Sequence, residues 1–323
     1  MRAIVVSRLG GPEVLELSEV PLPEAAPGEV RVRLRATGVN FADTERRRGI
    51  YATPRLPWTP GHEGAGIVDE IGEGVSPGLL GARVGFWSRG STGTYSTHAT
   101  VPAEHLFRFA TEVPFAQMAA LPLQGLTAYG VVHLAASVKK GQNVLVHAAA
   151  GGVGRIAVQL ALRAGARVIG TGSSEAKLAE IGALGATPLA YGEDQVRHVR
   201  ALTRGRGVEV VLDSVGLDTQ AASLASLAPF GTLIFYGEAS GAPLPVVIDD
   251  LYGRSLRVGA FGLDLDAAPE AYEQARRTLA EGVSEGWLKL AIAGTYGLSQ
   301  AADAHRALES RGTIGKVVLD PDT

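Results

Sequence analysis

Residues 143–154 read NVLVHAAAGGVG, and this stretch decides the fold. Its first half, residues 143–148, has the short apolar run of a buried strand, and the glycines that follow allow a tight turn. The apolar residues of 155–162 recur at helical spacing, and residues 167–171 predict another strand. A strand, a glycine-rich turn, a helix and a further strand together make one βαβ unit.

The same alternation continues as far as residue 260. Helices are predicted at 174–184 and 194–202, and strands at 188–191, 208–212, 232–235 and 256–260. Ser174 is a suitable N-cap for the first of these helices, because its hydroxyl can accept a hydrogen bond from an exposed backbone N–H group. Strands that alternate with helices in this way predict a doubly wound parallel sheet of the Rossmann type.

The N-terminal part of the chain follows a different pattern. Residues 30–36, VRVRLRA, alternate with a period of two, as a strand with one solvated face does. Further short apolar runs at 3–6, 64–71, 83–87 and 94–101 are separated by Gly and Pro. These runs predict a β-rich or barrel-like domain.

The C-terminal part contains two predicted helices, at 269–281 and 299–309, and a final strand at 315–319. No repeat and no long linker separates it from the rest, so we expect it to return to the first domain. The predicted domains are a β-rich domain at 1–122 and 260–323 and a nucleotide-binding domain at 123–259.

Composition limits the classes of partner. The 323 residues carry a net charge of −3, which gives no long-range attraction to nucleic acid or anionic lipid. The absence of cysteine excludes disulfides, thiolate nucleophiles, iron–sulfur clusters and sulfur-ligated zinc. The N-terminal apolar run is too short for a signal peptide, and no segment approaches the ~18 apolar residues of a membrane span. We expect a cytoplasmic protein whose partners are small molecules.

The glycine-rich turn predicts a dinucleotide site. The spacing of Ala148, Gly151 and Gly154, between a strand and a helix, lets the backbone approach a pyrophosphate. The helix N-terminus adds unpaired N–H donors and the positive end of its dipole. The alternative is a purely structural turn.

The residues after the second strand favour NADPH over NADH. An acidic residue about 20 positions beyond the turn would bind the ribose hydroxyls of NAD, but residues 171–174 read TGSS. Ser173, Ser174 and Lys177 instead offer donors to a 2′-phosphate. The alternative is that Ser174 only caps a helix and Lys177 is solvated.

Five motifs together resemble the zinc-independent quinone oxidoreductases of the medium-chain dehydrogenase/reductase superfamily. They are NFAD at 40–43, PGHE at 60–63, GLTAY at 125–129, HAAAGGVG at 147–154 and DSVG at 213–216. The resemblance extends over essentially the whole chain. It implies a GroES-like catalytic domain, a Rossmann domain inserted between its two segments, an active site in the cleft and a homodimer formed through the nucleotide-binding domains.

The resemblance also implies a set of site residues. The catalytic residues would be Asn40, Tyr51 and Thr127. The residues in contact with the cofactor would be Asn40, Thr127, Ala148, Gly151, Gly152, Val153, Gly154, Ser214 and Gly237, with Ser173, Ser174, Lys177, Tyr191 and Arg311 around its 2′-phosphate. Asn40 would bind the substrate carbonyl or the nicotinamide ribose, unless it only satisfies a turn. Thr127 would fix the nicotinamide, unless it only packs at a helix start.

The pair His62 and Glu63 raises the question of a metal, since both side chains can bind zinc. In the zinc-dependent alcohol dehydrogenase relatives, a Gly-His-Glu triplet acts with two cysteines, whose positions here correspond to Asn40 and the vicinity of Leu123. A site built from His62, Glu63 and Asp43 is the metal alternative. In the other interpretation, His62 and Glu63 are a hydrogen-bonded structural pair where a strand begins. We expect this interpretation to hold and the site to bind no metal.

Without a metal, hydride delivery requires an acceptor that is already electrophilic. We expect an NADPH-dependent, zinc-independent reductase that transfers hydride or electrons to quinones or other conjugated carbonyl acceptors. Glu45 and Arg46 lie where some quinone reductases have an aromatic residue, so the pocket is expected to be more polar. Two alternatives remain: an NADPH-dependent enoyl-thioester reductase with Tyr51 as the proton donor, and a non-catalytic NADPH-binding sensor.

Overall fold

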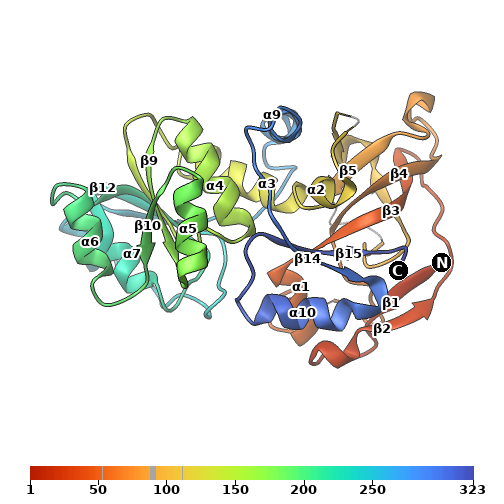
Figure 1. The fold of residues 1–323 in the computed structure, drawn as a ribbon, viewed down its shortest axis with the longest axis horizontal. Helices are drawn as coiled ribbons and strands as arrows, with labels where there is room; N and C mark the ends of the chain where they lie inside the picture. The colour runs from red at the N-terminus through yellow and green to blue at the C-terminus, as the bar shows by residue number, and fades with distance from the viewer. Residues whose placement is uncertain (53, 88–91, 111) are drawn as a thin grey trace. The chain divides into compact units, whose positions relative to one another are not determined.

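The fold is described from a computed structural model, which covers residues 1–52, 54–87, 92–110 and 112–323 (Figure 1). The chain forms two compact units. Unit 1 comprises Met1–Leu123 and Glu270–Thr323, and unit 2 comprises Gln124–Pro269. The functional domains expected from the sequence, at 1–122 with 260–323 and at 123–259, stay a prediction.

Unit 2 is built on a parallel sheet. Its strands are β8 (Asn143–Val146), β9 (Arg167–Gly172), β10 (Thr187–Ala190), β11 (Val208–Asp213), β12 (Leu227–Phe235) and β13 (Arg257–Ala260). They lie in the order β10-β9-β8-β11-β12-β13, and every neighbouring pair is parallel. The order reverses between β8 and β11, as in a doubly wound sheet. The predicted Rossmann arrangement is confirmed.

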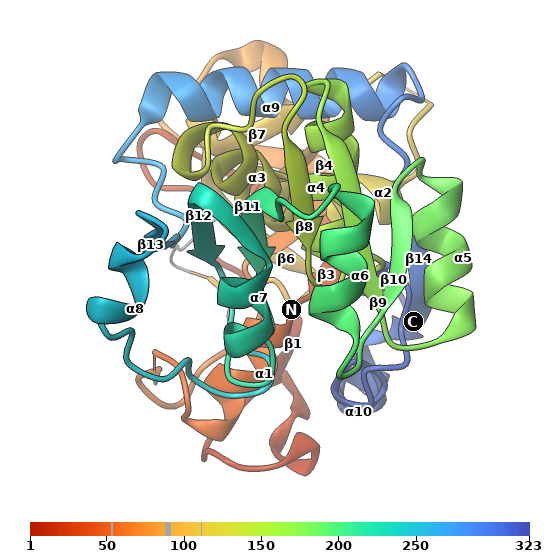
Figure 2. The ribbon, with the colours of Figure 1, turned by 90° about the vertical axis from the view of Figure 1, so that its left-hand side faces the viewer.

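Helices cover this sheet and bury its apolar side chains. They are α4 (Gly152–Arg163), α5 (Glu175–Ala183), α6 (Gln195–Leu202), α7 (Gln220–Ser226) and α8 (Asp249–Tyr252), preceded by α3 (Pro122–Tyr129) and a π-helical segment, Gly130–Ala135. The helix α4 packs against β8 and β9, α7 packs against β11 and β12, and α6 lies beside α7 (Figure 2). The core includes Leu145, Val211 and Leu233, which are fully buried.

The strand predicted at 143–148 is shorter than expected. It ends at Val146, because Ala148 takes a left-handed backbone conformation with φ of 49° and turns the chain out of the sheet. Gly151 is then the N-cap of α4. At Gly154, an added Cβ would lie 2.4 Å from the carbonyl oxygen of Ala148. Glycine is therefore required at 154 for close packing rather than for an unusual φ.

Unit 1 is β-rich, as predicted. Its described strands are β1 (Arg2–Val5), β2 (Glu16–Glu19), β3 (Glu29–Val39), β4 (Glu63–Ile71), β5 (Arg83–Trp87), β6 (His98–Pro102), β7 (Leu106–Arg108), β14 (Ile292–Gly297) and β15 (Lys316–Asp320). The main sheet has the order β14-β15-β3-β4-β5-β7, with β6 also paired to β3. The last strand, β15, is antiparallel to β3. Residues 94–97 precede β6, so the run predicted at 94–101 starts as a strand only at His98.

The helices of unit 1 lie around this sheet. They are α1 (Phe41–Arg48), α2 (Phe115–Ala119), α9 (Pro269–Ser284) and α10 (Ala301–Glu309), with short 3-10 turns at Pro12–Val14, Pro77–Leu79, Ala103–His105 and Leu298–Gln300. The helix α1 follows β3 directly and ends at Gly49, whose φ of 74° reverses the chain. It contacts α10, so segments from both ends of the sequence meet here (Figure 1). Within the described ranges, none of the helices has the length and apolar character needed to cross a membrane.

Gly154→Ala is expected to destabilise the protein. The new methyl group would meet the Ala148 carbonyl, and such overpacking costs about 1–3 kcal/mol. Gly182 in α5 is the matched control, because a Cβ there would have no neighbour within 4 Å and alanine is the better helix former. Thermal unfolding followed by circular dichroism should show a lower midpoint for Gly154→Ala and an equal or higher one for Gly182→Ala. Equal midpoints for the two variants would contradict the packing argument.

Candidate active site

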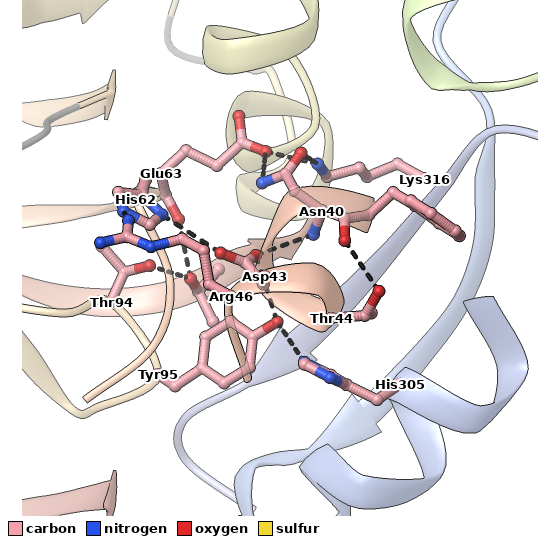
Figure 3. A network of polar contacts seen from close by, with 12 residues as sticks. Asn40, Asp43, Thr44, Arg46, His62, Glu63, Thr94, Tyr95, His305 and Lys316 are labelled. Carbon is pink, nitrogen blue, oxygen red and sulfur yellow. Dashed lines mark hydrogen bonds and ion pairs between the residues drawn. The ribbon is translucent and has the colours of Figure 1, made fainter. Parts of the chain in front are cut away.

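A buried polar network occupies unit 1 where α1, β4, α10 and β15 meet (Figure 3). The side chains of Asp43, Glu63, Tyr95 and His305 are fully buried, and Asn40 is only 6% exposed. Buried polar groups are costly unless they are hydrogen-bonded, so the partners of each group define what it can do.

The first part of the network holds Asn40 between two charges. The ammonium group of Lys316 donates to Asn40 Oδ1 at 2.6 Å and forms an ion pair with Glu63 Oε1. Asn40 Nδ2 donates to the same carboxylate oxygen at 2.9 Å. Because lysine only donates and a carboxylate only accepts, these contacts fix which end of the amide is oxygen. Among the described residues, the second N–H of the Asn40 amide has no acceptor.

The same contacts occupy both carboxylate oxygens of Glu63. Its Oε1 atom is engaged by Lys316 and Asn40, and its Oε2 atom accepts from the backbone N–H of Leu123 at 2.7 Å. Breaking such a buried pair by removing one partner costs roughly 3–5 kcal/mol. In the part of the chain that the structure describes, no group of three His, Cys, Asp or Glu side chains is arranged to hold a metal ion. Glu63 is a hydrogen-bonded element at the start of β4.

The second part of the network holds His62. Its Nδ1 atom contacts Asp43 Oδ1 at 3.1 Å, and its Nε2 atom contacts the guanidinium of Arg46. Arginine has no acceptor, so Nε2 must accept and the proton lies on Nδ1. His62 is therefore a neutral ring between an anion and a cation.

The third part of the network extends from Asp43 to α10. Asp43 Oδ2 accepts from the Asn40 backbone N–H at 2.9 Å and contacts the Tyr95 hydroxyl at 3.4 Å. Tyr95 also contacts His305 Nε2 at 2.9 Å, and His305 Nδ1 lies 3.0 Å from the guanidinium of Arg47. Since Arg47 can only donate, His305 carries its proton on Nε2 and donates to Tyr95. The hydroxyl proton of Tyr95 then points to Asp43.

Burial shifts the pKa values in this part of the network. Desolvation lowers the pKa of His305 to about 4; the charge of Asp43 opposes the shift and that of Arg47 reinforces it. Burial alone would raise the pKa of Asp43, but the hydrogen bonds from His62 and from the Asn40 backbone lower it overall. At neutral pH, His305 is neutral and Asp43 is ionised.

The predicted catalytic residues have different surroundings. Asn40 lies in the network, at the start of α1. Tyr51 follows the end of α1 and is 53% exposed. Thr127 belongs to unit 2, where it lies in α3 and is half-buried. Their catalytic roles stay predictions.

In unit 2, the glycine-rich turn has the form of an anion cradle. Gly152, Val153 and Gly154 are the first residues of α4, so their N–H groups have no intrahelical partner. No side chain caps this helix. The Gln124 amide packs against Gly152, where a Cβ would lie 2.0 Å from it, so this position of the turn requires glycine. These features fit the pyrophosphate of a dinucleotide.

A series of hydrogen-bonded buried side chains connects the glycine-rich turn to Asp213. The N–H of Ala148 donates to Thr171 Oγ1 at 3.2 Å, and Thr171 contacts His147 Nδ1 at 3.1 Å. His147 Nε2 contacts Ser223 Oγ at 3.0 Å, and Ser223 donates to Asp213 at 2.7 Å. The ring therefore carries its proton on Nε2. Burial lowers the pKa of His147, although Asp213 opposes this, and the ring is neutral.

The residues predicted around a 2′-phosphate lie mostly at the C-terminal end of β9. Lys177 Nζ donates to Ser173 Oγ at 3.2 Å, and partial burial lowers the pKa of Lys177. Ser174 is the N-cap of α5, because its hydroxyl accepts from the backbone N–H of Lys177. Tyr191 accepts from the Ala148 N–H at 2.9 Å. Arg311 belongs to unit 1, where it is exposed after α10.

The structure also brings Ser214 and Gly237 together. They follow β11 and β12, and a Cβ added at Gly237 would lie 3.0 Å from the Ser214 carbonyl oxygen. The C-terminal ends of adjacent parallel strands meet at one edge of a sheet, which is where such folds bind nucleotides. Cofactor contact by either residue stays a prediction.

Several residues of the network were not predicted from the sequence. Lys316, Tyr95 and His305 have no local motif that marks them. A lysine in the apolar strand GKVVL is the one available signal, since a buried lysine requires a partner.

The chain is similar to known proteins over almost its whole length. Residues 26–114 match the family described as "Alcohol dehydrogenase GroES-like domain", and residues 184–319 match "Zinc-binding dehydrogenase". A 2-haloacrylate reductase of Burkholderia sp. is 38% identical over 99% of this chain and 98% of its own length. A quinone oxidoreductase of Pseudomonas aeruginosa is 37% identical over 99% of each chain. The crystal structure of Escherichia coli quinone oxidoreductase complexed with NADPH has a TM-score of 0.92 at 36% identity, over 99% of this chain and 100% of that one.

A GroES-like unit and a Rossmann unit with a glycine-rich turn define a medium-chain dehydrogenase/reductase. Within that superfamily, the chain belongs to the quinone oxidoreductase family. The family resemblance seen in the sequence is confirmed.

Stability should fall between pH 7 and pH 5 because of His305. Its pKa is about 4 in the folded protein and about 6.5 when unfolded, so only the unfolded chain takes up the proton in this range. The loss from this residue is about 2 kcal/mol at pH 5. In urea unfolding, His305→Gln should reduce the difference in unfolding free energy between the two pH values by that amount. His198→Gln, at an exposed position in α6, is the control and should retain the full difference. An unchanged difference in His305→Gln would contradict the assignment.

Proposed function

We propose that this protein is an NADPH-dependent, zinc-independent reductase of quinones or other conjugated carbonyl acceptors. The observation that carries the proposal is the row of N–H groups at Gly152 to Gly154, which no side chain caps. After β9, a serine and a lysine stand in place of an acid. The names of the relatives, a quinone oxidoreductase and a 2-haloacrylate reductase, support the two kinds of acceptor.

The bound NADPH would supply the hydride. The N–H groups of Gly152, Val153 and Gly154 would bind its pyrophosphate, and Ser173 and Lys177 would bind its 2′-phosphate. The TGSS sequence at the end of β9 leaves no carboxylate to repel that phosphate. Tyr191 and Ala148 would hold the turn in shape through their hydrogen bond. Thr127, Ser214, Gly237 and Arg311 are proposed as further cofactor contacts.

Asn40 would orient the acceptor or the nicotinamide ribose. Its amide has one N–H that is not used by Glu63, and the contact of Lys316 with its oxygen strengthens that N–H as a donor. An amide donor does not activate a carbonyl as a metal ion does, so the acceptor must be electrophilic through conjugation. The ring of Tyr51 would pack against the acceptor.

Zinc independence is proposed from the donor set. The sequence has no cysteine, and both oxygens of Glu63 already have protein donors, one of them a lysine cation. A second cation beside Lys316 would be repelled.

A homodimer is proposed from unit 2. Leu244, Val247, Ile248 and Tyr252 lie close together in sequence around α8, and each is at least 56% exposed. An apolar surface of this kind is typical of an interface, and a second copy of the chain would cover it. The cytoplasmic location expected from the sequence stays a prediction.

The function is tested by following NADPH oxidation with a panel of acceptors. The protein, dialysed against a strong chelator, should reduce quinones or conjugated carbonyl compounds and leave simple ketones unreacted. Zinc content should be well below one ion per chain by elemental analysis. Failure to oxidise NADPH with every acceptor, or turnover that needs zinc, would contradict the proposal.

Lys177→Ala should weaken NADPH binding about 10–100-fold and leave NADH binding nearly unchanged. The reason is that Lys177 would form a charge-assisted hydrogen bond with the 2′-phosphate, worth roughly 1.5–3 kcal/mol. Cofactor titration monitored by fluorescence measures both affinities. Lys140→Ala, at an exposed position of the same unit, is the control and should bind both cofactors normally. An equal loss of both cofactors would point to a structural role for Lys177.

A further inference from the structure

Arg46 has hydrogen-bonding capacity that the protein does not use. It lies in the last turn of α1 and is half-buried. Its guanidinium contacts His62 through one terminal nitrogen and lies over the ring of Trp58 at 5.1 Å from the centroid. Its Nε atom is shielded from solvent and has no hydrogen-bond partner among the described residues. A buried donor without an acceptor costs free energy, so an arriving acceptor atom would be stabilised there.

The positive charge of Arg46 also has no carboxylate in contact with it, among the residues that the structure describes. Glu63 is paired with Lys316, and the carboxylate of Asp43 lies against the opposite nitrogen of the His62 ring. The neutral imidazole therefore separates the negative charge of Asp43 from the guanidinium. A negatively charged ligand would supply the anionic partner that the Arg46 guanidinium lacks among the described residues.

We propose that Arg46 binds the carboxylate of an anionic acceptor, so that the preferred substrates are α,β-unsaturated carboxylates rather than neutral quinones. This inference rests on the proposed reductase function. The planar guanidinium presents donors in a fork that matches a carboxylate, which neither a quinone nor an ester can engage as a charged pair. Arg46 is joined to Asn40 through His62 and Asp43, so the anion donor and the amide belong to one hydrogen-bonded network (Figure 3).

The reaction balances with NADPH as the only other reactant besides water. The β-carbon of the acceptor gains the hydride, and the electron pair of the double bond moves toward the α-carbon and the carboxylate. The α-carbon then takes a proton from water, which gives the saturated carboxylate, NADP⁺ and a hydroxide ion. Negative charge grows on the carboxylate as the hydride arrives, so a cation at that end stabilises the transition state more than the ground state.

The test uses a matched pair of acceptors, 2-chloroacrylate and its methyl ester, which differ in charge at the carboxyl group. In Arg46→Gln, the ratio of kcat/KM for the acid to that for the ester should fall about 10–100-fold. Arg48→Gln, at an exposed position in the same helix turn, is the control and should retain the wild-type ratio. An unchanged ratio in Arg46→Gln would overturn the inference.

A binding measurement on the wild-type enzyme needs no variant and no turnover of the probe. Saturated 2-chloropropionate should bind the NADPH complex at least tenfold more tightly than its methyl ester, by isothermal titration calorimetry. Equal affinities would overturn the inference. Reduction of 1,4-benzoquinone distinguishes failure of the Arg46 inference from failure of the proposed reductase function. If the quinone is reduced but the acid is preferred over the ester neither in turnover nor in binding, the reductase function stands and the role of Arg46 is wrong. If no acceptor is reduced, the proposed function itself fails.

Discussion

The buried ion pair between Lys316 and Glu63 is the interaction on which the site in unit 1 depends. Its two residues are 253 positions apart, and both are almost completely shielded from water. Gly38 makes the pair possible, because a Cβ there would lie 2.5 Å from the Glu63 carboxylate. The pairing of β15 with β3 delivers the lysine to this place. The orientation of Asn40 follows from the two charges on either side of its amide.

The polar networks around Asp43 and Asp213 are built in the same way. In each, a neutral histidine with a fixed tautomer connects a buried carboxylate to a group near the predicted site. His147 connects Asp213 to the glycine-rich turn through Thr171, and His62 connects Asp43 to Arg46. Because each histidine in these chains has a defined hydrogen-bond partner on both ring nitrogens, small displacements would cost hydrogen bonds, and the networks hold the site in place.

The sequence was sufficient for the fold where the signal is local. Strand and helix periodicity placed the elements of the Rossmann unit to within a few residues, and the glycines placed its turn. It missed α7, whose sequence QAASLAS has no clear apolar stripe, and the short α8, and it started β12 at 232 instead of 227. It also placed the end of β8 two residues late, because the left-handed turn falls on an alanine. The partners of Glu63 could not be predicted either. They come from β3 and β15, and only the folded sheet brings them together.

The late position of β15 has a consequence for synthesis on the ribosome. Unit 2 is one continuous segment, so all of its strands leave the ribosome before the C-terminal part of unit 1 has been made. Until residue 316 has been synthesised, the buried carboxylate of Glu63 lacks its ion-pair partner Lys316. The end of β3 that pairs with β15 also lacks that strand. The nascent chain would therefore carry a finished nucleotide-binding unit next to an unfinished one. A chain interrupted before residue 316 would still contain all of unit 2 but would lack the charge that orients Asn40.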